Sequence, residues 1–317
     1  MSEILDAARA RGLLPKRPVD GYKGTFGSLL VVAGSIHYPG AATLACAGAG
    51  RVGAGLVTLA TGRSVLGGGG RGPEVTLLPL PEADWGAIGP EAVEELEKRI
   101  ASYQALVIGP GLGQAEPTGL FIQRMLGLER PKTRSRVGFV GNSAANAPAG
   151  EGRKALELPP TVLDADGLNL LAGIEDWPEH MPKDRFVFTP HPGEMRRLLK
   201  VDDLDADTAI VARDAATRWG QVVVLKGATT VVAGPDGRTL VHEGNNPALA
   251  TAGTGDVLSG AIGGLLAQGL ALFDAAALGV YLHAAAGELV RAELGEMGTL
   301  ASDLLLRLPK AIMALRG

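Results

Sequence analysis

The sequence has a single cysteine, few aromatic residues and no block of like charges. Cys46 is alone among 317 residues, which excludes a disulfide scaffold within the chain and predicts a reducing compartment, the cytoplasm. There are only three tryptophans, four tyrosines and six phenylalanines. The 30 basic and 34 acidic residues form no charged tail, so we expect neither nucleic-acid binding nor docking on a membrane surface.

Long uninterrupted apolar runs are also missing. Residues 261–290 are the most hydrophobic stretch, but polar residues and glycines interrupt it. We therefore expect two buried helices joined near residues 269–274 rather than a membrane span. Residues 1–15 mix charged and small apolar positions, which predicts a short amphipathic helix rather than an export signal.

What the sequence does contain is a regular alternation of short apolar runs and helical segments. The runs are continuously apolar, which is typical of strands buried on both faces of a parallel sheet. They cover residues 29–33, 56–60, 105–108, 161–163, 185–189 and 222–225. Helices are predicted between them, for example at 91–102, 193–199 and 207–219. This order indicates a three-layer α/β/α fold with a central, mostly parallel sheet.

The pattern changes near the C-terminus. Residues 229–233 and 238–243 flank Gly-Pro-Asp-Gly, which predicts an antiparallel hairpin. No internal repeat or linker divides the chain, and two loops, 67–72 and 131–152, are interpreted as insertions. In open α/β sheets ligands bind beyond the carboxyl ends of the strands, so residues that follow each run are candidates for function.

The strongest chemical signal is a glycine-rich turn before a helix predicted at 257–268. Gly253, Thr254 and Gly255 would expose backbone N–H groups at the start of this helix, where the dipole also favours a phosphate. Asp256 is placed to take a proton from a substrate hydroxyl. The alternative is that Asp256 is an ordinary N-cap, but capping does not require two preceding glycines.

Two other glycine patterns are weaker. Residues 48–53 match the dinucleotide-binding spacing G-x-G-x-x-G, yet they follow a helical segment and precede a strand, so we reject an NAD site there. These glycines are interpreted as the end of a helix packed closely on the sheet. Gly109, Gly111 and Gly113 directly follow a predicted strand, where backbone can approach a ligand or simply turn.

Polar clusters follow three further strands. Asp164 and Asp166 point the same way on an extended segment and are candidates to share a cation or a ribose hydroxyl; alternatively Asp166 caps the next helix. Prolines on both sides of His191 hold it extended, which favours ligand contact. Glu194 is placed to hold Mg²⁺ through water or to interact with the helix dipole. Lys226 offers a cation to a nucleotide.

Together these motifs resemble one family, the ADP-dependent NAD(P)H-hydrate dehydratases, which are ribokinase-like. The resemblance covers nearly the whole chain from Lys23 to Leu308. It rests on Lys23-Gly24 with Gly27, Pro39-Gly40-Ala41-Ala42, Gly109-Pro110-Gly111-Leu112-Gly113, Asp164-Ala165-Asp166-Gly167-Leu168-Asn169, Thr189-Pro190-His191-Pro192-Gly193-Glu194, Lys226-Gly227-Ala228-Thr229-Thr230 and Ala252-Gly253-Thr254-Gly255-Asp256.

The resemblance implies a division of the site. The substrate, hydrated NADH or NADPH, would contact Ala41, Gly113, His191 and Asp256. The nucleotide, ADP or ATP with Mg²⁺, would be held by Lys226, Gly227, Ala228, Thr229, Thr230, Gly253, Thr254 and Gly255. It also implies a homotetramer. Residues 1–22 would be a helical extension and 23–317 a single domain without the epimerase that some members carry, so a separate epimerase would be the functional partner.

The implied reaction is dehydration of the S-form of the hydrate at the expense of ADP, giving AMP and phosphate. Asp256 would accept the hydroxyl proton while the Gly253–Gly255 amides stabilise the moving phosphoryl group. Two alternatives stay open at this point. One is a kinase of the same superfamily that phosphorylates a hydroxymethylpyrimidine or thiazole, and the other is a nucleotide sensor without catalysis.

Overall fold

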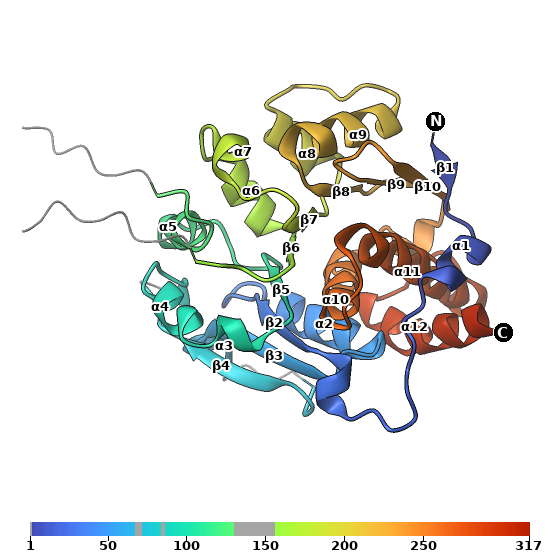
Figure 1. The fold of residues 1–317 in the computed structure, drawn as a ribbon, viewed down its shortest axis with the longest axis horizontal. Coiled ribbons are helices and arrows are strands. Elements are labelled where there is room, and N and C mark those ends of the chain that lie inside the picture. The colour runs from blue at the N-terminus through green and yellow to red at the C-terminus, as the bar shows by residue number, and fades with distance from the viewer. Residues whose placement is uncertain (1, 67–71, 84–85, 130–155) are drawn as a thin grey trace, which may run out of the picture.

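A computed structural model describes residues 2–66, 72–83, 86–129 and 156–317 of the chain. Its strands form one ten-stranded sheet in the order β1-β10-β9-β8-β7-β6-β5-β2-β3-β4, with helices on both faces (Figure 1). Among the described strands only β9 runs antiparallel to its neighbours, β8 and β10. The predicted three-layer fold with a mostly parallel sheet and a hairpin is therefore confirmed.

The strands form where the sequence predicts apolar runs. Their bounds are β1 (Glu3–Ile4), β2 (Ser28–Val32), β3 (Leu56–Gly62), β4 (Thr76–Leu80), β5 (Ala105–Ile108), β6 (Thr161–Leu163), β7 (Phe186–Phe188), β8 (Val222–Leu225), β9 (Thr229–Ala233) and β10 (Thr239–Glu243). Alternate residues of each strand face opposite layers. In β2, Leu29 and Val31 join one core cluster, and Leu30 and Val32 join the other.

Each face of the sheet has its own set of helices. One core cluster packs under α1 (Ala7–Gly12), α2 (Pro39–Arg51), α10 (Thr254–Ala267), α11 (Leu272–Leu294) and α12 (Ala301–Arg316). The other packs under α4 (Ala92–Glu97), α5 (Glu116–Met125), α6 (Asp166–Ala172), α7 (Trp177–His180), α8 (Pro192–Leu199) and α9 (Thr208–Trp219). Short helical turns complete the described elements: α3 (Arg63–Leu66), η1 (Lys23–Phe26), η3 (Ile100–Ser102) and η4 (Pro247–Leu249).

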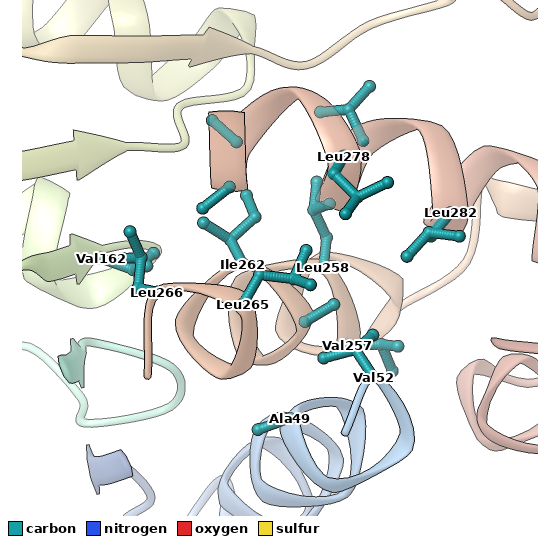
Figure 2. Packing of buried hydrophobic residues seen from close by; sticks show 14 of the residues in the cluster. Ala49, Val52, Val162, Val257, Leu258, Ile262, Leu265, Leu266, Leu278 and Leu282 are labelled. Atoms are coloured by element: carbon teal, nitrogen blue, oxygen red, sulfur yellow. The ribbon is translucent and has the colours of Figure 1, made fainter. Parts of the chain in front are cut away.

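Helix α10 is the centre of its layer and packs closely on α2 and α11 (Figure 2). A Cβ atom on Gly260 would lie 2.0 Å from the Ala45 carbonyl oxygen, and one on Gly48 would lie 2.5 Å from that of Val257. The glycines therefore let two helices touch backbone to backbone. This corrects the interpretation of residues 48–53: Gly48 packs against a helix, not against the sheet.

Three other expectations can be compared with the structure. The predicted break near residues 269–274 is confirmed, because α10 ends at Ala267 and α11 begins at Leu272. The helix expected within residues 1–15 is limited to α1, and Glu3–Ile4 instead pairs in parallel with β10. The insertion at 131–152, and most of that at 67–72, lie outside the described residues. No described helix has the length and apolar character needed to cross a membrane.

Candidate active site

The candidate site lies where the strands of the parallel sheet end and α10 begins. Gly253 is the N-cap of α10 in a left-handed conformation, φ +92°, that favours glycine. The Thr254 hydroxyl donates hydrogen bonds of 3.0 Å to the carbonyls of Leu249 and Thr251 and so closes the turn. Because Gly253 has no side chain, the first N–H groups of α10 receive no cap from it, and uncapped N–H groups at a helix start are suited to bind an anion.

The helix begins three residues earlier than predicted. Thr254, not Val257, is its first residue, so Asp256 lies inside the first turn and the hypothesis that Asp256 is the N-cap is wrong. Glycine disfavours helix interiors, which explains why sequence patterns place Gly255 outside the helix. Tertiary packing overrides that preference here.

His283 of α11 supports this turn. Its Nε2 lies 2.9 Å from the carbonyl oxygen of Thr254. Burial lowers the pKa of His283 to about 4, so the ring is neutral and Nε2–H donates to that carbonyl. This contact could not be predicted from the sequence, because a single histidine within a long apolar helix forms no spacing pattern that indicates its partner.

Close to the turn, one lysine interacts with three carboxylates, those of Asp164, Glu194 and Asp256. Lys226 Nζ lies 3.0 Å from Asp164 Oδ1 and 4.0 Å from Glu194 Oε2. A Cβ atom on Gly255 would lie 3.4 Å from the same ammonium. The lysine that follows β8 therefore lies close to the Gly253–Gly255 turn and to the carboxylates that follow β6 and β7.

Burial, and then the charge of neighbouring groups, shifts the pKa of two carboxyl groups in the site. Burial, and then the negative charge of Asp164, raises the pKa of Asp256 to about 7, against the opposing effect of Lys226. Burial likewise raises the pKa of Glu194 to about 7, again opposed by Lys226. A carboxyl group with a pKa near neutrality is suited to accept and release a proton at physiological pH.

His191 is both a helix cap and a wall of the site. Its Nδ1 accepts hydrogen bonds from the N–H groups of Gly193 (3.0 Å) and Glu194 (3.3 Å), while the Glu194 carboxylate accepts from the His191 N–H at 2.8 Å. This capping box fixes the ring, with the proton on Nε2. Burial, and then Lys226, lowers the pKa of His191. Half of the imidazole stays exposed beside the cavity.

Asp164 and Asp166 do not share a partner. Asp164 pairs with Lys226, whereas Asp166 accepts hydrogen bonds from the Gly113 N–H (2.8 Å) and the Gln114 side-chain amide (3.0 Å). Ala165, at φ +49°, is the N-cap of α6, so the capping role considered for Asp166 is wrong. Asp166 instead holds the glycine loop that follows β5.

Gly113 lies in this loop, and Ala41 lies next to it. Ala41 is in the first turn of α2, and a Cβ atom on Gly111 would lie 2.8 Å from the Ala41 Cβ. The buried Ser35 hydroxyl, which has no described hydrogen-bond partner, would lie 3.8 Å from a Cβ on Gly113. Two of the residues expected to contact substrate, Ala41 and Gly113, therefore lie in the segments that follow β2 and β5.

A cavity of about 520 Å³ opens on the opposite side, toward β9 and β10. Its wall includes seven of the predicted site residues: His191, Lys226, Gly227, Ala228, Thr230, Thr254 and Gly255. Five other predicted site residues are not part of this wall: Ala41, Gly113, Thr229, Gly253 and Asp256. It also includes residues that the sequence analysis did not select, among them His242, Asn246 and His283. This volume lies in the range of small-molecule sites.

The Mg²⁺ expected from the sequence has no ready-made ligand set. Among the described residues no three His, Cys, Asp or Glu side chains are grouped to hold a metal ion. Glu194 is already engaged by the His191 N–H and lies near Lys226.

Comparison with known proteins identifies close relatives. A model of the NAD(P)H-hydrate dehydratase family matches residues 29–133 and 143–310. A bifunctional NAD(P)H-hydrate repair enzyme of Moorella thermoacetica is 40% identical over 311 residues, which cover 96% of this chain and 53% of that enzyme. The chain thus spans about half the length of the first curated relatives that it matches.

Two further relatives match over most of their length. An ADP-dependent (S)-NAD(P)H-hydrate dehydratase of Neisseria meningitidis is 34% identical over 303 residues, covering 94% of this chain and 89% of that protein. The crystal structure of an ADP/ATP-dependent NAD(P)H-hydrate dehydratase of Bacillus subtilis, co-crystallised with ATP and Mg²⁺, superposes with a TM-score of 0.72 at 28% identity, covering 99% of both chains.

Proposed function

The chain belongs to the NAD(P)H-hydrate dehydratase family, and from this premise we propose that it restores NADH and NADPH from the S-forms of their hydrates. ADP would be the phosphoryl donor and would leave as AMP with inorganic phosphate. One observation carries the proposal: a carboxyl group with a pKa raised to about 7, Asp256, lies in the first turn of α10 beside its uncapped N–H groups.

The proposed reaction begins at the hydroxyl of the hydrated ring. Asp256 takes the hydroxyl proton as the oxygen bonds to the terminal phosphorus of ADP and the bond to the AMP oxygen breaks. The N–H groups after Gly253 and the Lys226 ammonium stabilise the charge on the moving phosphoryl group. The lone pair of the ring nitrogen then expels phosphate, and loss of a neighbouring proton restores the dihydropyridine ring.

The carboxylates of Asp164, Glu194 and Asp256 have one reactant proposed on each side. The cavity lined by Lys226 and Thr254 is the proposed nucleotide site, and the loop that carries Gly113, together with Ala41, is the proposed substrate side. His191, which was expected to contact the substrate, lines the nucleotide cavity. Mg²⁺ bound to the nucleotide phosphates would offset the negative charge that a single lysine leaves uncompensated, with Glu194 as a candidate to hold it through water.

Incubation of the protein with hydrated NADH, ADP or ATP, and Mg²⁺ tests this function. Recovery of the absorbance of reduced nicotinamide together with release of phosphate supports it, whereas a stable phosphorylated product without that recovery would identify a kinase. Asp256→Asn should lose turnover by at least about a hundredfold and still bind AMP. Near-normal turnover of this variant would contradict the role of Asp256.

The same family membership supports a proposal about assembly. We expect a homotetramer and, as functional partner, an epimerase that supplies the S-form of the hydrate. Light scattering of the purified chain measures the first, and faster consumption of a mixed R and S substrate on adding an epimerase measures the second.

A further inference from the structure

A second cavity, of about 230 Å³, lies at the other end of α10. Leu265 and Gln268 at the C-terminal end of this helix form part of its wall. Helix α10 has 14 residues, so at 1.5 Å per residue this wall is roughly 20 Å from the phosphate-binding turn. The cavity is therefore separate from the site described above.

The wall is apolar and its rim is positively charged. Most of the apolar residues in the wall are large aliphatic residues or methionine: Leu14, Val52, Leu265, Leu282, Ile312 and Met313. Figure 2 labels Val52, Leu265 and Leu282 in the packing around α10. Arg17, Arg51 and Arg316 stand at the rim, and none of the residues that line the cavity is acidic. A protein of net charge −4 thus concentrates three guanidinium groups at one apolar hollow.

Arg17 has a structural role that accounts for its position. Its Nη1 donates a 3.0 Å hydrogen bond to the Gly53 carbonyl, and its guanidinium stacks 3.8 Å above the Phe26 ring. The Gln268 amide donates to the carbonyls of Val52 (3.1 Å) and Gly264 (2.9 Å). Arg17 and Gln268 therefore donate hydrogen bonds to backbone carbonyl groups at the ends of α2 and α10, where the helices leave such groups unpaired.

The other two arginines of the rim, Arg51 and Arg316, do not have a structural role of this kind. Within the described residues, Arg51 and Arg316 have no recorded hydrogen bond or ion pair, and both side chains are exposed. Each lies in the last turn of a helix, where a cation is favourable. That interaction leaves all the N–H donors of the guanidinium available to a ligand.

We propose that this cavity binds a small amphipathic monocarboxylate, with its apolar chain inside and its carboxylate on Arg51 and Arg316. A guanidinium fork matches a carboxylate in geometry. A cavity of 230 Å³ has room for about eight groups of the size of water or methylene, at roughly 30 Å³ each. The helix-end carbonyls of α2 and α10 are close by and oppose negative charge, so a double charge would be disfavoured more strongly than a single one.

Binding of octanoate to the full chain tests this site. Calorimetry should show one saturable site, and octanoate should raise the melting temperature. Octylamine reverses the head-group charge, octanol removes it and acetate removes the chain, so each should bind at least about tenfold more weakly. Equal binding of octylamine or of acetate would overturn the proposal, as would the absence of saturable binding.

Variants locate the bound molecule. The double variant Arg51→Gln/Arg316→Gln should weaken octanoate binding by roughly tenfold or more, while Arg218→Gln, an exposed arginine on α9, should leave it unchanged. Ile312→Trp should fill the cavity and abolish binding without loss of cooperative unfolding. Undiminished binding in both the double variant and Ile312→Trp, or displacement of octanoate by AMP, would place the ligand elsewhere and overturn the proposal.

Discussion

Replacing Asp256 by asparagine should make the protein more stable at pH 8 while it removes catalysis. In the folded protein the pKa of Asp256 is raised from 3.8 to about 7, chiefly by burial and then by Asp164. The folded state therefore binds more protons than the unfolded chain between about pH 4 and pH 7. Stability falls as the pH rises through this range and the loss is complete above it.

The magnitude follows from the same two values. The difference between 3.8 and about 7 corresponds to roughly 4 kcal/mol at 1.36 kcal/mol for each pH unit. Because the carboxyl group keeps some exposure to solvent, we expect a gain of about 2–4 kcal/mol for Asp256→Asn at pH 8. Near pH 4.5 the gain should shrink to about 1 kcal/mol or less, because this pH lies only slightly above the unfolded-state pKa of 3.8 while the folded-state carboxyl group is still protonated.

Urea denaturation of the wild type and of Asp256→Asn at pH 4.5 and pH 8 measures this difference. Glu194 titrates in both proteins, and its contribution largely cancels in the comparison because its charge is the smallest of the causes that shift the pKa of Asp256. Asp202→Asn, at an exposed position, is the matched control and should change stability by less than about 0.5 kcal/mol at either pH. If Asp256→Asn is destabilising at pH 8, or if its effect does not depend on pH, the electrostatic account of this site is wrong.

Other predictions concern the buried interior. Lys226→Met should cost about 2–4 kcal/mol because it leaves Asp164 buried and unpaired, and adding Asp164→Asn should recover more than half of that loss in urea denaturation. Gly260→Ala should cost more than about 2 kcal/mol because its Cβ would strike a carbonyl of α2. Gly50→Ala, whose Cβ meets nothing within 4 Å, should be neutral or stabilising; equal losses for the two alanines would refute the close-packing argument. Burial raises the pKa of Cys46 to about 12, so maleimide should label this thiol only after unfolding.

The sheet was largely predictable because each central strand is apolar along most of its length. Runs such as 105–108, 161–163 and 222–225 coincide with β5, β6 and β8. Strand β1 was not predicted, because two residues carry no periodicity and its formation depends on pairing with β10 from the far end of the chain. Strand β4, at the opposite edge, contains Pro79, which lowers its signal.

The site was predictable where it depends on local backbone, as at the Gly253 turn, and much less where it depends on partners. Asp164 pairs with Lys226, and Asp166 accepts a hydrogen bond from the Gly113 N–H. Both contacts follow from the order of β5, β6, β7 and β8 in the sheet. No spacing in the chain encodes those contacts. The support of Thr254 by His283 links residues 29 positions apart and is invisible for the same reason.

The two outermost strands of the described sheet also bear on how the protein behaves at high concentration. A long, flat border strand offers free backbone groups to other molecules and invites aggregation. Here one border is β1, only two residues long, where Glu3 pairs with Arg9. The other is β4, in which Pro79 has no N–H to donate. Removing residues 2–5 would uncover the five-residue β10, so a truncated protein should form aggregates that the intact chain resists.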